Sequence, residues 1–483
     1  MTTERIDLAP GLNISRVVTG LWQIADLERD GKTLDARTTA AAMSAYAEAG
    51  LTSFDMADHY GSAEVIAGTF RKEFAKTPAQ FFTKWVPTPG PISRNDVRHA
   101  VQLALTRLQT EQIDLMQFHA WNYADSRWLD CLFFLTELKK EGLIGHLGLT
   151  NFDTAHLRIV LASGIPVVAN QVCYSLLDQR ASGAMKDLCL ENEVQLLAFG
   201  TLAGGFLSNR WLNKPEPMGN ALKTWSEMKY KRFIDTSGGW SQLQGVLAVL
   251  NEIAVSHKTS IANVASRFIL DQPAVAAVII GARLGTSQHI EDTTSLFRLS
   301  LHPHDHAKIR EALSTLTPIP GDCGDEYRRP PFLTASGDLS HHLESMPAPY
   351  PTLEGSDGQT KALSGTVWED LAGFSRAVRK GNRILVSGTT ATHGMIDIGG
   401  QDPAAQTHFI IDKIEGAIQS LGGTLDNVVR TRIYIRNIND WEPIARAHGE
   451  RFKGIQPANT MVKAELIGSN YLLEMEAEAE VNR

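Results

Sequence analysis

Polar residues interrupt apolar segments at several points in the first part of the chain, and their types suit proton transfer. Asp55 lies in TSFDMAD, Lys84 in QFFTKWV and His119 in DLMQFHAW, and Tyr60 follows Asp55 by five positions. A tyrosine hydroxyl can donate a proton, although its ordinary pKa is about 10. A neighbouring ammonium that stabilises the phenolate makes that proton easier to give.

These residue types fit the reduction of a carbonyl group. When a hydride adds to the carbonyl carbon, the oxygen gains negative charge and needs a proton donor and positioned hydrogen bonds. We expect Tyr60 to donate the proton, Lys84 to assist it and Asp55 to hold Lys84. His119 beside the tyrosine would orient the carbonyl. Taken singly, the Asp55–Lys84 pair could be structural and His119 a core histidine, but a common position at one rim favours catalysis.

The elements that must position these residues alternate between strands and helices. Eight short apolar strands are predicted near residues 16, 52, 80, 114, 144, 167, 194 and 275. Helical spacing of apolar residues covers 36–50, 62–74, 93–109, 128–142 and 153–164, and Ser93 with Asp96 forms a capping signal. The α/β alternation predicts a (β/α)8 TIM barrel with its working residues at the C-terminal strand ends. A doubly wound open sheet is the alternative.

A second domain is expected after a linker rich in Pro, Gly, Ser and Asp. We place the barrel at 1–325, the linker at 326–362 and a small α+β domain at 363–483. Strands are predicted at 364–371 and 374–390, the latter with a Gly381-Asn382 hairpin turn, and further strands at 428–437, 459–466 and 471–481. Helices are predicted at 404–421, after Asp402-Pro403, and at 440–452.

The first part resembles the aldo-keto reductases over about residues 5–320, through FDMADHYG, FFTKW, DLMQFHAW, GLTNF and NQVCYSLL. The resemblance implies a (β/α)8 barrel that binds NADPH without a Rossmann motif. It places a catalytic tetrad on Asp55, Tyr60, Lys84 and His119. Arg283 would bind the 2′-phosphate, which favours NADP(H) over NAD. The implied cofactor-binding positions are Trp22, Thr150, Asn151, Gln171, Phe199, Gly200, Leu202, Gly281, Arg283, Gln288 and Asp292.

Aromatic residues follow several of the predicted strands at the same rim. Trp22, Trp85 and Trp121 would form an aromatic wall for a planar or apolar substrate. Any of them could instead pack beneath a loop. No residue of this wall identifies the substrate.

The second domain resembles the RidA/YjgF family of reactive-intermediate deaminases, through FSRAVRKGNRILVSGTTA, LDNVVRTRIYIRNINDW and EMEAEAEV. The resemblance implies a homotrimer with small-molecule clefts between subunits, and hydrolysis of imines or enamines in active members. Phe374, Asn459 and Glu474 fall on cleft positions. Asn459 replaces the family's carboxylate-binding arginine, and an amide cannot offer a guanidinium fork.

The composition of the chain limits the classes of partner that we expect the protein to bind. The net charge is −8 with no long run of like charge, which argues against nucleic acid, including as a ribonuclease substrate. The four cysteines lack metal-ligand spacing, so we expect no metal and reduced thiols in a cytoplasmic protein. No signal peptide or membrane-spanning run is apparent.

Three functions follow as hypotheses. The first is an NADP(H)-dependent reductase of a small aldehyde or ketone with a RidA-like module for trimerisation and small-molecule binding. The second is a bifunctional enzyme whose RidA-like domain hydrolyses an imine and whose barrel reduces the carbonyl product. The third is a non-catalytic binding protein, which the intact tetrad disfavours.

Overall fold

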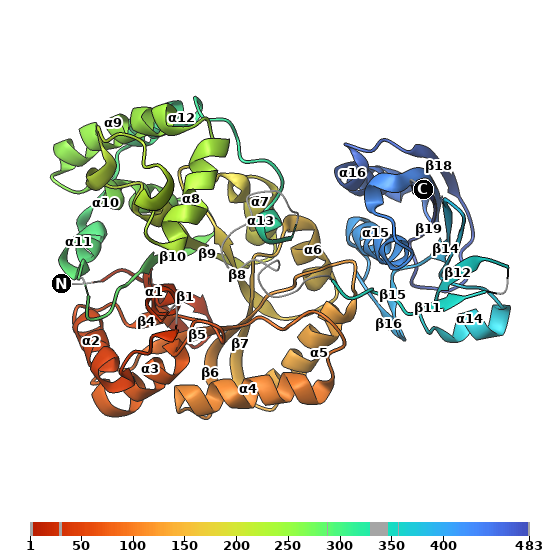
Figure 1. Ribbon diagram of the computed structural model, residues 1–483, viewed down its shortest axis with the longest axis horizontal. Coiled ribbons are helices and arrows are strands. Elements are labelled where there is room, and N and C mark those ends of the chain that lie inside the picture. The colour runs from red at the N-terminus through yellow and green to blue at the C-terminus, as the bar shows by residue number, and fades with distance from the viewer. Residues whose placement is uncertain (1–2, 29–30, 287, 329–345, 356, 482–483) are drawn as a thin grey trace.

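The computed structural model describes residues 3–28, 31–286, 288–328, 346–355 and 357–481. The chain forms two units that lie side by side (Figure 1). The first is a barrel with helices around it, and the second is a mixed sheet with helices against one face.

Eight parallel strands close the barrel in the order β10-β3-β4-β5-β6-β7-β8-β9. Val278 of β10 pairs with Val17 of β3, so the last strand meets the first and the barrel prediction is confirmed over the open sheet. The barrel strands are β3 (Val17–Gly20), β4 (Ser53–Asp55), β5 (Gln80–Trp85), β6 (Ile113–Phe118), β7 (Ile144–Thr150), β8 (Val167–Cys173), β9 (Gln195–Phe199) and β10 (Val275–Gly281).

Helices surround the barrel because their apolar faces cover the outward side chains of the strands. Ser93 and Asp96 form the expected capping box at the start of α4. The helices of this unit are α1 (Trp22–Leu27), α2 (Ala36–Glu48), α3 (Ala63–Thr69), α4 (Arg94–Leu108), α5 (Arg127–Lys140), α6 (Thr154–Ala162), α7 (Ala184–Glu191), α8 (Trp225–Thr236), α9 (Trp240–His257), α10 (Ile261–Leu270), α11 (Ile290–Ser295), α12 (Pro303–Leu313) and α13 (Asp325–Arg328).

An N-terminal hairpin that the sequence analysis did not identify contributes to the barrel's inner core. Its strands are β1 (Arg5–Ala9) and β2 (Leu12–Ser15). Ile14 is fully buried and belongs to one apolar cluster with Phe82 and Leu197. The cluster fills the barrel interior, so the functional cavity is confined to the C-terminal strand ends.

The second unit is a seven-stranded sheet in the order β11-β12-β13-β14-β19-β17-β18. Gly381-Asn382 forms the expected turn between β13 and β14, and Asp402 caps α15 with Pro403 in its first turn. The strands are β11 (Thr352–Glu354), β12 (Gln359–Ala362), β13 (Ala377–Lys380), β14 (Arg383–Thr389), β17 (Val428–Ile435), β18 (Ala458–Lys463) and β19 (Leu473–Glu480), with a separate ribbon of β15 (Thr392–His393) and β16 (Ile396–Asp397). The helices are α14 (Val367–Ala372), α15 (Pro403–Ser420) and α16 (Trp441–Phe452).

Two expectations for this region were wrong. Residues 364–371, predicted as a strand, contain helix α14, because Glu369 accepts hydrogen bonds from Ser364 and Gly365 and Gly373 ends the helix with a φ of 68°. The expected linker 326–362 contains β11 and β12, so the second sheet begins earlier than predicted. Residues 329–345 of that linker lie outside the described residues.

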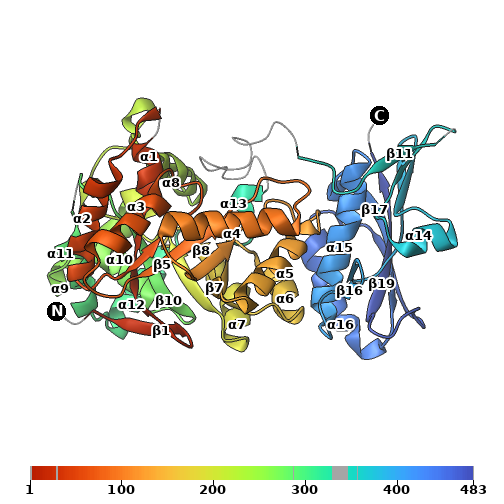
Figure 2. The same ribbon diagram turned by 90° about the horizontal axis from the view of Figure 1, so that it is seen from below.

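Helix α15 packs against α6 and joins the two units (Figure 2). His156 of α6 is buried, with Nδ1 2.6 Å from Asp153 and Nε2 2.9 Å from Asp412 of α15. The ring of Tyr123 stacks on His156 at 3.4 Å, and Arg451 pairs with Asp412 at 2.6 Å. Burial opposes the imidazolium, but the two carboxylates outweigh it and raise the pKa of His156.

This contact should make the stability of the protein depend on pH. Because the folded pKa of His156 is raised, its stabilising effect is complete below the unfolded pKa of about 6.5 and is lost as pH rises through the folded value. We expect His156→Gln to lower the free energy of unfolding by about 3 kcal/mol at mildly acidic pH. Urea denaturation at a series of pH values measures this, and a difference that does not shrink at alkaline pH would contradict it.

Candidate active site

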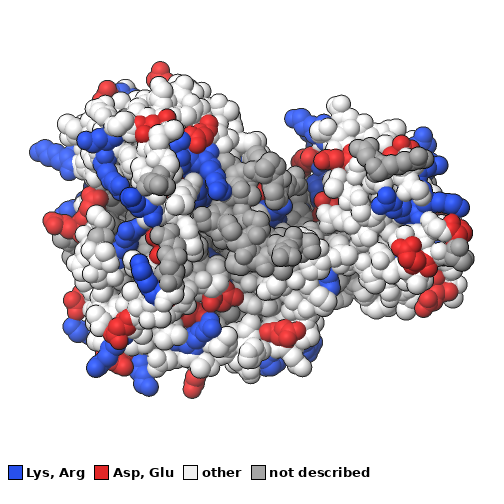
Figure 3. Space-filling model, viewed as in Figure 1, with Lys and Arg blue, Asp and Glu red and all other residues white. Residues whose placement is uncertain are grey.

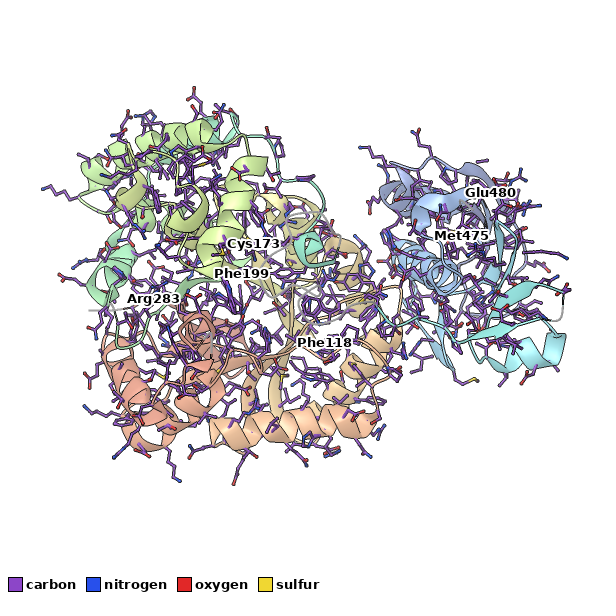
Figure 4. The ribbon with its side chains drawn as sticks, in the orientation of Figure 1. Phe118, Cys173, Phe199, Arg283, Met475 and Glu480 are labelled. Carbon is purple, nitrogen blue, oxygen red and sulfur yellow. The ribbon has the colours of Figure 1, made fainter. Side chains whose placement is uncertain are left out.

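A cavity of about 930 Å³ opens at the C-terminal ends of the barrel strands. It extends from Asp55, Tyr60, Lys84 and His119 to Arg283 and Asp292. The rim position follows from strand geometry, since in a parallel barrel these ends meet at one face. Figure 4 shows Cys173 and Phe199 together at the ends of β8 and β9, with Arg283 farther along the same face.

A buried ion pair lies at the centre of the site. Lys84 Nζ donates to Asp55 Oδ2 at 2.6 Å and to the Met56 carbonyl at 2.8 Å. The other carboxylate oxygen, Asp55 Oδ1, accepts from Gln117 at 3.1 Å and Gln171 at 2.7 Å. Burial lowers the pKa of Lys84, and Asp55 opposes that effect. Both oxygens of Asp55 are therefore used to hold its neighbours in place.

Tyr60 lies next to this pair, with Lys84 Nζ 5.1 Å from its ring centre. Its ring also packs edge-on against Trp22 at 4.9 Å. Burial raises the pKa of Tyr60 well above its ordinary value, and the charge of Asp55 adds to this. Burial therefore favours the neutral hydroxyl of Tyr60, the form that can donate a proton.

The ring of His119 is oriented by the backbone of the next strand. Its Nδ1 lies 3.2 Å from the Thr150 carbonyl, which can only accept, so we assign the ring proton to Nδ1. Burial lowers the pKa of His119 well below its ordinary value, and Arg328 contributes to this. The neutral ring therefore presents the lone pair of Nε2, which is buried and has no hydrogen-bond partner among the residues that the structure describes.

Most of the positions expected to bind the cofactor line the cavity. Gln288 is exposed and is not among the lining residues, whereas the next residue, His289, is. The expected residues that line the cavity are Trp22, Thr150, Asn151, Gln171, Phe199, Gly200, Leu202, Gly281, Arg283 and Asp292.

Several cavity-lining residues have polar atoms suited to a bound molecule. Asn151 Oδ1, Gln23 Oε1 and Ser266 Oγ are buried and have no hydrogen-bond partner within the described part of the chain. Gly200 has a φ of 76°, and a Cβ there would lie 2.2 Å from the Tyr230 hydroxyl, so only glycine fits. An elongated cavity with unpaired amide and hydroxyl oxygens and a glycine-lined wall fits a dinucleotide.

The expected aromatic wall is smaller than predicted. Trp22 and Trp121 line the cavity, and the ring of Trp121 meets that of His119 at 4.4 Å. Trp85 instead packs on Phe118 at 5.7 Å in the layer between strands and helices. The alternation of β5 explains this, because Lys84 points inward and the next side chain must point outward. Phe118, labelled in Figure 4, marks that layer.

Lys229 and Tyr327 also line the cavity and were not predicted. Lys229 lies in α8 and Tyr327 in α13, far from the strand ends in sequence. The lysine at position 229 in the sequence WSEMKYKRF gave the only signal, since it falls among apolar residues on the buried face of that helix.

The expected cleft residues of the second unit do not all come together within one chain. Phe374 lies near Arg376, which donates to the Gly388 carbonyl at 2.6 Å beside Glu474. Burial raises the pKa of Glu474. Asn459 lies on a different strand and donates to the Thr431 hydroxyl at 2.9 Å.

The described residues contain no helix long and apolar enough to cross a membrane, and no group of His, Cys, Asp and Glu placed to hold a metal ion. Lysine and arginine are interspersed with acidic residues on the face seen in Figure 3. The four cysteines are buried free thiols.

Comparisons with known proteins match both parts of the chain. The model of the Aldo/keto reductase family matches residues 16–314, and that of Endoribonuclease L-PSP matches 367–481. Aldo-keto reductase YhdN of Bacillus subtilis is 25% identical over 343 residues, which cover 66% of this chain and 96% of the relative.

Two solved structures are also similar. The glycerol dehydrogenase of Gluconobacter oxydans has a TM-score of 0.51 at 22% identity and covers 66% of this chain and 97% of its own, which is a likeness of fold. A member of the YjgF/YER057c/UK114 family from Mycobacterium tuberculosis is 40% identical, covers 26% of this chain and 99% of its own, and has a TM-score of 0.24.

Proposed function

Since the chain belongs to the aldo/keto reductase family and carries a RidA/YjgF-type second domain, we propose that its barrel is an NADP(H)-dependent reductase of aldehydes or ketones. The observation that carries the proposal is the buried Asp55–Lys84 pair next to Tyr60 in the large cavity. The test is nicotinamide oxidation by the purified protein against a panel of aldehydes and ketones.

The reaction adds one hydride and one proton to the carbonyl group. The reduced nicotinamide supplies the hydride to the carbonyl carbon when bound. Tyr60 gives its hydroxyl proton to the oxygen as negative charge develops there. The ammonium of Lys84 stabilises the phenolate that remains, and Asp55 fixes that ammonium. Because burial favours the neutral form of Tyr60, the phenolate that forms needs this ammonium beside it.

His119 takes a narrower role than the sequence suggested. With its proton on Nδ1, the neutral ring accepts a hydrogen bond at Nε2 and so suits the alcohol hydroxyl. It donates to a carbonyl oxygen only when protonated or in the other tautomer. We therefore assign carbonyl protonation to Tyr60 alone.

The nicotinamide would lie between Phe199 and the catalytic residues. Gln171 Nε2 already donates hydrogen bonds to Asp55 and Gln117. The amide oxygen of Gln171 is therefore left to accept from the carboxamide of the nicotinamide. Asn151 Oδ1 is a second unpaired acceptor at this end of the cavity. Gly200 and Leu202 would meet the pyrophosphate, and Ser266 and Asn263 the adenosine end.

We propose NADP rather than NAD because Arg283 lies at the far end of the cavity. It is 39% exposed and lies 3.7 Å from Asp26, which orients it. Replacing Arg283 with Gln should raise the KM for NADPH by about 10- to 100-fold, the range for a charge-assisted hydrogen bond, and leave NADH unaffected. Arg298→Gln, outside the cavity, is the matched control. Equal losses with both cofactors would contradict the phosphate contact.

For the second domain we propose homotrimer formation through the sheet face opposite α15. Leu385 and Val462 are exposed there, at 48% and 45%, in register with Glu478 and Tyr434 of the neighbouring strands. Exposed apolar side chains on a sheet mark a surface that can be covered by another chain.

The trimer predicts the effect of a charge at this face. Sedimentation equilibrium should give a trimer for the intact protein and a monomer for Val462→Arg, because an arginine would be buried without a partner. Val255→Arg, at an exposed position of α9 in the barrel, should leave the mass unchanged. A monomeric parent protein would contradict the proposal.

The bifunctional alternative requires the second domain to hydrolyse an imine. Asn459, in place of a carboxylate-binding arginine and bonded to Thr431, speaks against ordinary imino-acid hydrolysis. Ammonia release from simple imino acids distinguishes the two. The buried free thiols support a reducing, cytoplasmic location.

A further inference from the structure

Lys229 is a buried lysine that the proposed reaction does not use. It lies in α8, is 9% exposed and lines the same cavity as Tyr60 and His119. A buried ammonium loses its hydration, and native proteins normally compensate it with a hydrogen-bonded carboxylate. Among the residues that the structure describes, no carboxylate lies within salt-bridge distance of Lys229 Nζ.

The direct contacts of this ammonium are a hydroxyl and aromatic rings. Lys229 Nζ donates to the Tyr327 hydroxyl at 2.5 Å. It lies 5.0 Å from the ring centre of Phe199 and 5.4 Å from that of Tyr230. One of its three N–H groups is therefore used by an oxygen.

A purely structural role for Lys229, as the positive partner of nearby carboxylates, would explain why it is charged. It would not explain why two of its N–H groups are unused. Burial opposes the charge, yet the pKa of Lys229 is raised, because its hydrogen bond to Tyr327 and the nearby Glu326 carboxylate favour the charged form. The Glu326 carboxylate is itself bonded to Arg180 at 2.8 Å, and Arg180 also pairs with Asp178 at 2.7 Å. The Glu326 carboxylate therefore favours the charged form of Lys229 without accepting a hydrogen bond from the lysine.

Tyr327 connects Lys229 to the reacting end of the cavity. Its ring lies 5.9 Å from that of His119, and both residues line the cavity that contains Tyr60. Because the Tyr327 oxygen accepts from Lys229, its own hydrogen is left to donate. One N–H and one O–H donor thus stand side by side, a short distance from the proton donor.

We propose that Lys229 and Tyr327 form a carboxylate-binding subsite, so that the substrate of the barrel is an oxo acid. This rests on the proposed carbonyl reduction. The two donors match the two oxygens of a carboxylate, while the aldehyde or ketone carbon of the same small molecule lies at Tyr60 and His119. Binding at this subsite orients the carbonyl in the cavity.

The test compares para-carboxybenzaldehyde with its methyl ester as substrates of the full-length protein. Lys229→Met should lower kcat/KM for the acid on the order of 10- to 100-fold, mainly through KM, and leave the ester unchanged. Lys229→Arg should recover part of the loss, and Tyr327→Phe should cause a smaller loss with the same selectivity. Lys231→Met is the matched control, since Lys231 of the same helix pairs with Glu216 and Asp235 away from the cavity.

NADPH binding, followed by fluorescence quenching, separates the alternatives. An unchanged dissociation constant in Lys229→Met supports the subsite. A raised constant, with equal losses for acid and ester, overturns it and assigns the lysine to the cofactor. If the parent reduces the ester and Lys229→Met reduces the acid as well as the parent does, the subsite alone is overturned. A parent protein that binds NADPH but reduces no carbonyl compound overturns the proposed function as well.

Discussion

Tyr60→Phe should lower kcat for carbonyl reduction on the order of 10²- to 10⁴-fold, the contribution of a positioned general acid. The loss should be this large because neither of its two polar neighbours, His119 and Lys84, can replace the hydroxyl as proton donor. The pKa of His119 is lowered by burial, and its Nδ1 proton is used by the Thr150 carbonyl. The ammonium of Lys84 is bonded to Asp55 and Met56.

A measurement of NADPH binding distinguishes loss of the proton donor from disruption of the whole active site. The NADPH dissociation constant of Tyr60→Phe should equal that of the parent, because the phenyl ring keeps its contact with Trp22. Tyr46→Phe is the matched control, since Tyr46 is a buried tyrosine that lines the same cavity. Steady-state kinetics that retain most of the parent turnover in Tyr60→Phe would remove the proposed acid.

Lys84→Met should impair both catalysis and folding. Loss of the ammonium leaves the phenolate of Tyr60 unstabilised in a buried site, which should lower kcat on the order of 10²- to 10³-fold. It also leaves the buried Asp55 carboxylate with only the amide donors of Gln117 and Gln171. We expect the free energy of unfolding to fall by about 3–5 kcal/mol, measured by urea denaturation.

An exposed ion pair provides the comparison. Lys76 and Glu48 lie 2.7 Å apart at the surface, with the lysine side chain 79% exposed. Lys76→Met should leave turnover and the denaturation midpoint unchanged, because solvent screens such pairs. Similar midpoints for the parent and Lys84→Met would show that the Asp55–Lys84 pair does not stabilise the fold.

Strong local patterns made the barrel predictable from the sequence. Each of its eight strands is a short apolar run, and capping residues such as Ser93 mark the helix starts. The second sheet was harder to delimit, because β11 is exposed along its length and β12 is a largely polar, half-buried strand that pairs with β13. Helix α14 was mistaken for a strand, since its start depends on the bonds of Glu369 rather than on apolar periodicity.

The place of the four proposed catalytic residues at one rim of the barrel was predictable for the same reason, because each interrupts or follows an apolar strand. The orientation of a side chain was not, as Trp85 shows: one step along β5 separates the cavity from the outer layer. Lys229 and Tyr327 could not be assigned, since only the tertiary fold brings α8 and α13 over the strand ends. The tautomer of His119 likewise depends on the position of one carbonyl.

The carboxylate subsite bears on the relation between the two domains. Hydrolysis of a 2-imino acid releases an oxo acid, which is the substrate class proposed for the barrel. The buried contact of His156 with Asp412 holds the domains together, so such a product would be released close to the reductase. Ammonia release from a 2-imino acid by the full-length protein tests this sequence of reactions, since Asn459 replaces the carboxylate-binding arginine.

The most direct test of the central claim is the reduction of para-carboxybenzaldehyde by the purified full-length protein with NADPH. The account predicts that NADPH quenches the protein's fluorescence and that one alcohol forms for each NADPH oxidised. It also predicts that Tyr60→Phe binds NADPH equally well and forms almost no alcohol. A protein that binds neither NADPH nor NADH, or whose alcohol formation persists in Tyr60→Phe, would contradict the account.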